Sequence, residues 1–166
     1  MNRIIKFRAK SRADGKWYDG DLHTLCDEPH IHTDSSTYPY AGKRQFIDAD
    51  TIGQFTGLCD CKGVEIYEGD ILRVKEYENQ LMREFSDDGN RFDRFTLDEI
   101  KGELRKEYVS PVCWEDGTFC ISTKGERDYN DMFLACLFGD MKRSSPIFDF
   151  VVIGNIYDNP ELLEKK

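Results

Sequence analysis

Long apolar runs are missing from this 166-residue chain. No window approaches the roughly 18 apolar residues that a membrane-spanning helix needs. Charges at Arg3, Lys6, Arg8 and Lys10 interrupt the first ten residues, so this segment lacks the apolar core of a secretion signal. We therefore expect a cytoplasmic protein whose six cysteines are mostly reduced thiols.

An excess of basic residues is also missing. The chain has 23 Lys and Arg against 32 Asp and Glu, which gives a net charge of −9. This balance repels a phosphate backbone and disfavours generic nucleic-acid binding. Hydrophobic residues make up 39% of the chain and aromatic residues 13%, which is typical of a folded protein with a real core.

Catalytic signatures are the third absence. The sequence contains no phosphate-binding loop, no G-x-S-x-G elbow and no dinucleotide fingerprint. Closely spaced carboxylates do occur, but chance pairs are expected among 32 acids. These pairs are Asp19/Asp21, Asp48/Asp50 and Glu68/Asp70. The sequence therefore predicts a protein that is not an enzyme, with no catalytic residue and no cofactor.

Short strand-like segments separated by turns fill most of the chain, notably over residues 4–8, 16–22, 71–74 and 147–153. The clearest hairpin covers residues 112–121, where Asp-Gly between apolar runs predicts a two-residue turn. That register places Trp114 opposite Phe119 and Cys113 opposite Cys120. The two cysteines then form a hydrogen-bonded pair, which suits a disulfide less well, so we expect two half-buried free thiols.

Helical signals are fewer. Thr96 and Glu99 form a capping box, and apolar residues then recur at three- and four-residue spacing, which predicts a helix from Leu97 to about Lys106. Residues 131–138 suit a short buried helix, and Asn159-Pro160 predicts the start of a last short helix. Between Cys26 and Arg44 the pattern predicts a long irregular segment.

Four segments, in order, carry a resemblance to a known family. They are IKFRAK at 5–10 with Trp17, TIGQFTGL at 51–58, EIYEGDILRV at 65–74 and VIGNIYDNPELL at 152–163. With these segments the chain resembles the YopX-like proteins of phages, prophages and other mobile elements. It departs from the usual pattern at Cys59 and Cys61, where such proteins tend to have Lys-Asp-Lys.

The resemblance implies a mainly β protein with a small SH3-like or pseudo-barrel core that self-associates as a homo-oligomer in the host cytoplasm. It brings no enzymatic activity, ligand or catalytic residue. Combined with the residue pattern, it predicts a single domain over residues 1–166. A charged insertion is expected at about 77–108, helical at about 96–108, together with a short C-terminal helix.

One set of side chains is a candidate zinc site. Cys59 and Cys61 lie one residue apart, and Cys26, His30 and His32 come from a second loop, so thiolates and imidazoles could complete a tetrahedron. The one-residue gap is less typical than the gap of two to four residues in zinc knuckles. The alternative, an exposed turn that holds two cysteines, is therefore favoured, and no metal is predicted.

The function that these observations favour is that of a non-enzymatic, self-associating protein-interaction module. Its contact surfaces would be the loop at 26–45 and the charged insertion, and its partner a host or phage protein. The alternative is a nucleic-acid-binding protein that uses the barrel surface and the aromatic and basic residues of Tyr38–Arg44. An acidic decoy that imitates DNA ranks last, because the acids are interspersed with bases.

Overall fold

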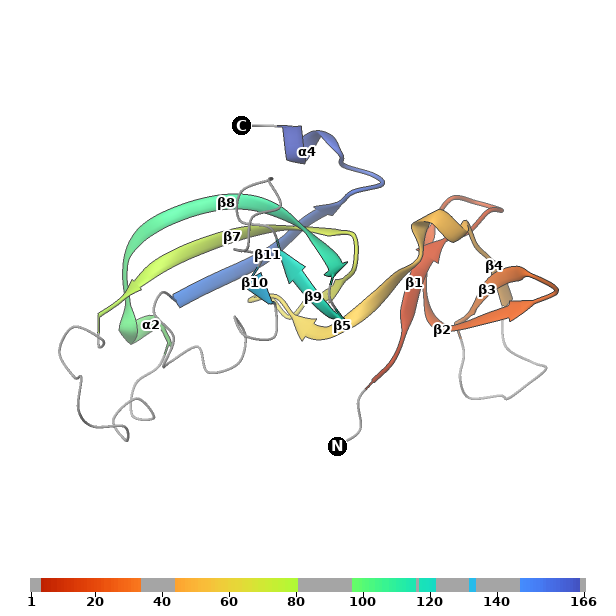
Figure 1. Ribbon diagram of the computed structural model, residues 1–166, viewed down its shortest axis with the longest axis horizontal. Helices are drawn as coiled ribbons and strands as arrows, with labels where there is room; N and C mark the ends of the chain where they lie inside the picture. The colour runs from red at the N-terminus through yellow and green to blue at the C-terminus, as the bar shows by residue number, and fades with distance from the viewer. Residues whose placement is uncertain are drawn as a thin grey trace. The chain divides into compact units, whose positions relative to one another are not determined.

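A computed structural model describes residues 4–33, 44–80, 97–115, 117–121, 132–133 and 147–164. Contacts divide the chain into two compact units (Figure 1). The N-terminal unit comprises Met1–Cys59 and Glu65–Gly69, and the C-terminal unit comprises Asp60–Val64 and Asp70–Lys166. Each unit contains one antiparallel sheet, so the prediction of a mainly β protein is confirmed.

The N-terminal unit, red through yellow in Figure 1, holds a six-stranded sheet in the order β4-β3-β2-β1-β5-β6. Its elements are β1 (Phe7–Lys10), β2 (Trp17–Leu25), β3 (Glu28–His32), β4 (Arg44–Phe46), the 3₁₀ helix η1 (Ala49–Thr51), β5 (Gly53–Cys59) and β6 (Glu65–Tyr67). Side chains alternate between the two faces of a strand. One face forms a small core of Ala9, Ile31 and Ile47, against which Tyr18 and Leu22 pack.

The sheet curls back on itself without closing. An isolated bridge pairs Ser11 with Ile47, just beyond the ends of β1 and β4. The Asp48 amide also donates to the Lys10 carbonyl at 2.8 Å. Because β5 and β6 continue the sheet on the other side of β1, the described strands form no closed barrel. The predicted SH3-like or pseudo-barrel core is therefore corrected to a curled, open sheet.

The C-terminal unit, green to blue in Figure 1, holds a five-stranded sheet in the order β10-β9-β8-β7-β11. Its elements are β7 (Asp70–Asn79), α2 (Leu97–Ile100), β8 (Lys101–Glu115), β9 (Thr118–Ile121), β10 (Met132–Phe133), β11 (Ile147–Asn155) and α4 (Glu161–Glu164). Leu72, Val74 and Phe150 are buried on one face of this sheet, where Phe150 lies directly opposite Val74. The predicted C-terminal helix is confirmed as α4.

The predictions of a hairpin and of an irregular segment differ in outcome. The hairpin at 112–121 is confirmed in its register, with Trp114 opposite Phe119 and Cys113 opposite Cys120. The irregular segment predicted after Cys26 is wrong over Glu28–His32, which forms β3. Only one side chain of β3, Ile31, reaches the core, so its sequence shows little apolar alternation.

The helix predicted for 97–106 is wrong beyond its first turn. The helix α2 ends at Ile100, and β8 starts at Lys101. Pairing between β7 and β8 runs from Asn79 opposite Lys101 to Ile71 opposite Pro111. This ladder satisfies the backbone and overrides the local helical preference. The predicted cap residue Thr96 lies outside the described residues.

Two further helical predictions concern partly described segments. The charged insertion predicted at 77–108 consists, in its described ends, of the paired strands β7 and β8. Of the predicted helix at 131–138, the described residues 132–133 form the strand β10, and the other residues lie outside the description. Within the described residues, no helix has the length and apolar character required to cross a membrane.

A buried aspartate holds the turn Asp60–Val64 against β11. The Asp60 carboxylate accepts hydrogen bonds from the amides of Lys62 at 2.8 Å, Val64 at 2.9 Å and Val152 at 3.1 Å. Burial alone would raise the pKa of Asp60, but these three donors hold it below its usual range. The turn therefore covers part of the outer edge of β11, whose unpaired backbone groups would otherwise be exposed.

Candidate functional site

The outer face of the N-terminal sheet, opposite its apolar core, carries most of the chemistry of this unit. Directly opposite residues in antiparallel strands share a face. The register pairs Arg8 with Asp19, and Lys10 with Trp17. It likewise pairs His23 with His30, and His30 with Phe46. Two groups of side chains result, one centred on β1 and one on β3.

The first group is a cation–aromatic network centred on β1. The Arg8 guanidinium lies 4.9 Å from the centroid of the Trp17 ring and 4.7 Å from that of Tyr67. The Lys6 ammonium lies 2.6 Å from a Glu65 carboxylate oxygen. Each cation–aromatic contact contributes about 0.5–2 kcal/mol, and more when it is shielded from water. The network therefore ties β1 to its neighbours β2 and β5 and, through Tyr67 and Glu65, to β6.

Ionisation in this network follows from the same contacts. Burial alone would lower the pKa of Lys6, but hydrogen bonds with Glu65 and Tyr67 raise it well above its ordinary value. The hydrogen bond from Lys6 lowers the pKa of Glu65. Burial raises the pKa of Tyr67 to about 12. At neutral pH the network thus contains a fixed ion pair and a protonated phenol, which suits a structural role.

The second group is the histidine patch, made of His23, Leu25, His30, His32 and Phe46. The ring centroids of His23 and His32 are 4.7 Å apart, and those of His30 and His32 are 5.0 Å apart. The Phe46 ring centroid lies 6.0 Å from that of His30. Leu25 is 48% exposed and Phe46 is 45% exposed, whereas His30 is buried. Exposed apolar side chains thus flank a packed group of imidazoles.

The electrostatic setting of the histidine patch keeps His32 uncharged. Burial lowers the pKa of His32, and the nearby imidazoles and Arg44 lower it further, while Asp21 opposes the shift. His32 is therefore neutral at pH 7. At the border of the patch, Arg12 forms an ion pair with Glu28. The five residues of the patch include no Asp, Glu, Lys or Arg, on a protein of net charge −9.

The residues of the candidate zinc site do not converge. His30 and His32 share β3, and Cys26 is exposed in the turn that follows β2. Cys59 ends β5, which β1 and β2 separate from β3, and neighbouring strands lie about 4.8 Å apart. Cys61 belongs to the C-terminal unit. In the described part of the chain, no group of three ligand atoms within 4.8 Å includes any of these residues.

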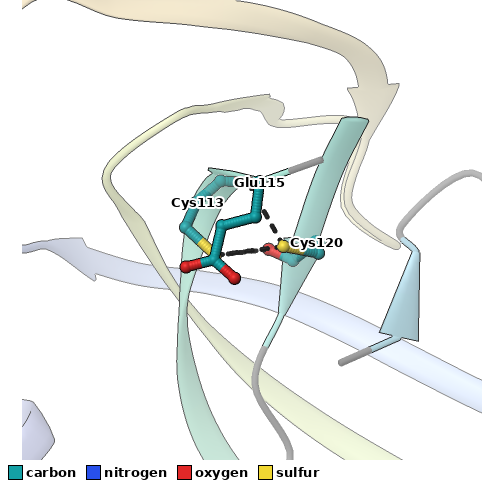
Figure 2. Close-up of side chains that lie close together, drawn as sticks. All are labelled: Cys113, Glu115 and Cys120. Atoms are coloured by element: carbon teal, nitrogen blue, oxygen red, sulfur yellow. Dashed lines mark hydrogen bonds between the residues drawn. The ribbon is translucent and has the colours of Figure 1, made fainter. Parts of the chain in front are cut away.

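A different cluster in the C-terminal unit does bring metal-binding side chains together. It consists of Cys113, Glu115 and Cys120, whose ligand atoms all lie within 4.8 Å of one another. The two sulfurs are 3.1 Å apart. Figure 2 shows the Glu115 carboxylate beside the Cys113 sulfur, with Cys120 facing them from the neighbouring strand. Cys120 is buried, Cys113 is half-buried and Glu115 is exposed.

The sequence contains a signal for this cluster in the hairpin at 112–121. The predicted register already placed Cys113 opposite Cys120. Glu115 follows Cys113 by two residues, and residues two apart on a strand share a face. The carboxylate was therefore predictable as a third member.

The chain is similar to known proteins over nearly its whole length. A sequence model of the YopX protein family matches residues 6–164. The chain belongs to the YopX family. No curated protein matches it significantly. Among solved structures, the chain is similar to protein EF1440 from Enterococcus faecalis, with 23% identity, a TM-score of 0.48, and coverage of 98% of this chain and 99% of that one.

In this YopX-family protein, residues from several segments that carried the resemblance contact one another in the N-terminal sheet. Lys6, Arg8 and Trp17 build the cation–aromatic network with Glu65 and Tyr67. These family motifs therefore specify how the strands of the N-terminal sheet join. Of the predicted aromatic and basic loop Tyr38–Arg44, only Arg44 is among the described residues.

Proposed function

We propose that this YopX-family protein is a non-enzymatic accessory protein of a phage, prophage or other mobile element. It acts in the host cytoplasm by binding proteins, and it self-associates through the histidine patch. The supporting observation is the patch itself, in which two large apolar side chains from β2 and β4 lie exposed around three packed imidazoles. Aromatic residues are enriched, and charged residues depleted, at the cores of protein interfaces.

The distribution of charge favours a second copy of the chain as the partner that binds the patch. Two copies, each with a net charge of −9, repel one another over most of their surfaces. Contact is least unfavourable where a surface carries no net negative charge, and the patch is such an area. A two-fold symmetric dimer places the same patch on both sides of the interface.

Substitution in the patch tests this proposal. Leu25→Glu places a carboxylate within the proposed interface, twice in a symmetric dimer. We expect the dissociation constant to rise by at least about tenfold, because a desolvated unpaired charge costs well over 1.4 kcal/mol. Sedimentation velocity over a range of protein concentrations measures the constant.

Leu104→Glu is the matched control, because Leu104 is 49% exposed but lies on β8 in the C-terminal unit. We expect this variant to associate like the wild type, with both variants retaining the wild-type circular dichroism spectrum. A wild-type protein that stays monomeric at micromolar concentration would refute the proposal. Equal association of both variants and the wild type would refute the patch as the interface.

Acidification provides an independent prediction. The folded-state pKa of His32 lies below the ordinary value of about 6.5, because burial and the neighbouring cations and imidazoles disfavour its charged form. Protonation of His32 therefore places a positive charge beside two other imidazoles and Arg44, an effect that Asp21 partly offsets. We expect association that is full above pH 7 and weakens as the pH falls below about 6.5.

Light scattering after size exclusion at pH 7.5 and pH 5.5 measures this change, with His32→Gln as the variant that removes one titrating ring. That variant should lose part of the pH dependence. An association that strengthens on acidification would contradict the prediction.

One observation favours the second candidate, nucleic-acid binding. Lys6, just before β1, and Arg8 and Lys10 of β1 lie beside aromatic rings, a combination that can track a single strand. Lys6 is already engaged by Glu65, however, and Arg8 by two rings. A fluorescence anisotropy titration with labelled oligonucleotides at low salt discriminates the two, since salt-sensitive binding supports this candidate alone.

A further inference from the structure

We propose that Cys113, Cys120 and Glu115 form a binding site for a thiophilic divalent cation of the zinc class. The site lies entirely on the hairpin of β8 and β9, so it is independent of the histidine patch. It also differs from the candidate zinc site considered in the sequence, since it uses none of those residues.

The hairpin geometry brings the two thiols to within a small displacement of a metal-bound arrangement. Cys113 lies directly opposite Cys120, and their sulfurs are 3.1 Å apart. Zinc–sulfur bonds of about 2.3 Å in a tetrahedral site imply sulfurs about 3.8 Å apart. Small rotations of two side chains therefore suffice, without a change in strand register.

Glu115 supplies the third ligand. It follows Cys113 by two residues on the same strand face, and its carboxylate lies within 4.8 Å of both sulfurs (Figure 2). Because Glu115 is exposed and Cys120 is buried, the cluster opens to solvent on one side. A fourth position can then be filled by water, as in zinc sites with three protein ligands.

Charge favours a cation in this cluster. Two thiolates and a carboxylate together carry three formal negative charges, and residues 112–121 contain no Lys, Arg or His. Three such groups at close range repel one another unless they are protonated or bind a cation. Cys113 and Cys120 also form a hydrogen-bonded cross-strand pair, the arrangement less suited to a disulfide.

Cobalt(II) substitution tests the site directly. We expect the reduced full-length protein to bind one cobalt ion per chain, with thiolate charge-transfer absorption in the near ultraviolet and the visible bands of a tetrahedral site. Zinc should displace the cobalt and raise the melting temperature. Cys113→Ser should weaken binding by at least about a hundredfold, and Glu115→Gln by about tenfold.

The double variant Cys59→Ser/Cys61→Ser is the control, because both cysteines are exposed and lie outside the cluster. It should bind cobalt like the wild type. Cys113→Ser is preferred to Cys120→Ser, because Cys113 is only half-buried, and its circular dichroism spectrum checks that it folds. The proposal is overturned if the reduced wild type takes up no metal, or if Cys113→Ser binds as tightly as the wild type. Protein isolated with Cys113 and Cys120 disulfide-bonded that takes up no metal after reduction would also overturn it.

Discussion

Replacing Asp60 with alanine is expected to lower the free energy of unfolding by about 3 kcal/mol. The Asp60 side chain is 6% exposed, and its carboxylate accepts three backbone hydrogen bonds. Alanine leaves those partly buried donors without their acceptor, and an unsatisfied group that is shielded from water costs about 1–3 kcal/mol. Urea denaturation followed by far-ultraviolet circular dichroism measures the loss.

The effect of pH on this prediction has a definite sign. The folded-state pKa of Asp60 is below its value of about 3.9 in an unfolded chain. Its stabilisation is therefore full above about pH 4 and is lost as the pH falls through the folded-state pKa. The difference in stability between the wild type and Asp60→Ala should accordingly shrink below about pH 4.

Two matched variants separate the parts of the Asp60 contact. One carboxylate oxygen accepts from Lys62 and Val64, and the other accepts from Val152. Asp60→Asn can keep the first two bonds but turns an amide donor toward the Val152 amide, so we expect a loss of about 1–2 kcal/mol. Asp50→Asn alters an exposed side chain and should change stability by less than about 0.5 kcal/mol. Equal losses at Asp60 and Asp50 would contradict this account.

Gly20→Ala is expected to have the other large effect, a loss of about 4 kcal/mol or failure of the N-terminal sheet to form. Gly20 lies in β2 at the change of pairing partner from β1 to β3, with φ at +153°. A β carbon there would lie 2.0 Å from the His32 carbonyl oxygen, which belongs to the backbone and cannot rotate away. The substitution therefore forces β3 away from β2.

The protein carries two tryptophans, and the background Trp114→Phe leaves Trp17 in β2 as the fluorescent reporter of this sheet. Gly15→Ala is the control, because Gly15 also has a positive φ but no atom lies within 4 Å of its would-be β carbon. We expect that control to lose only about 1 kcal/mol. Since the histidine patch depends on β3 pairing with β2, Gly20→Ala should also abolish self-association, whereas Gly15→Ala should preserve it.

Signals confined to one turn predicted local structure correctly, whereas the apolar spacing after Thr96 wrongly predicted a helix over residues that form β8. The Asp-Gly turn defined the register of the 112–121 hairpin, and Asn159-Pro160 preceded α4. The β8 strand was missed because its pairing with β7 is formed by residues up to 40 positions apart, such as Ile71 and Pro111. Local apolar spacing contains no information about such a partner.

The candidate sites also divide into those that a local turn determines and those that depend on long-range strand pairing. The opposition of Cys113 and Cys120 could be predicted, because one turn determines it. The histidine patch could not, because it requires β3 to pair with β2 on one side and with β4 on the other. The candidate zinc residues, which the sequence analysis disfavoured as a site, do not converge for a related reason, since a sequence does not reveal that two strands separate β3 from β5.

The turn that Asp60 holds has a consequence for biosynthesis. It lies between β5 and β6 of the N-terminal unit, yet its partner Val152 lies 92 residues further along the chain. On a ribosome, the first sheet can therefore form while the Asp60 carboxylate still lacks its donor on β11. The edge of β11 is covered only after that late segment has emerged, so this contact joins an early-synthesised turn to a late-synthesised strand.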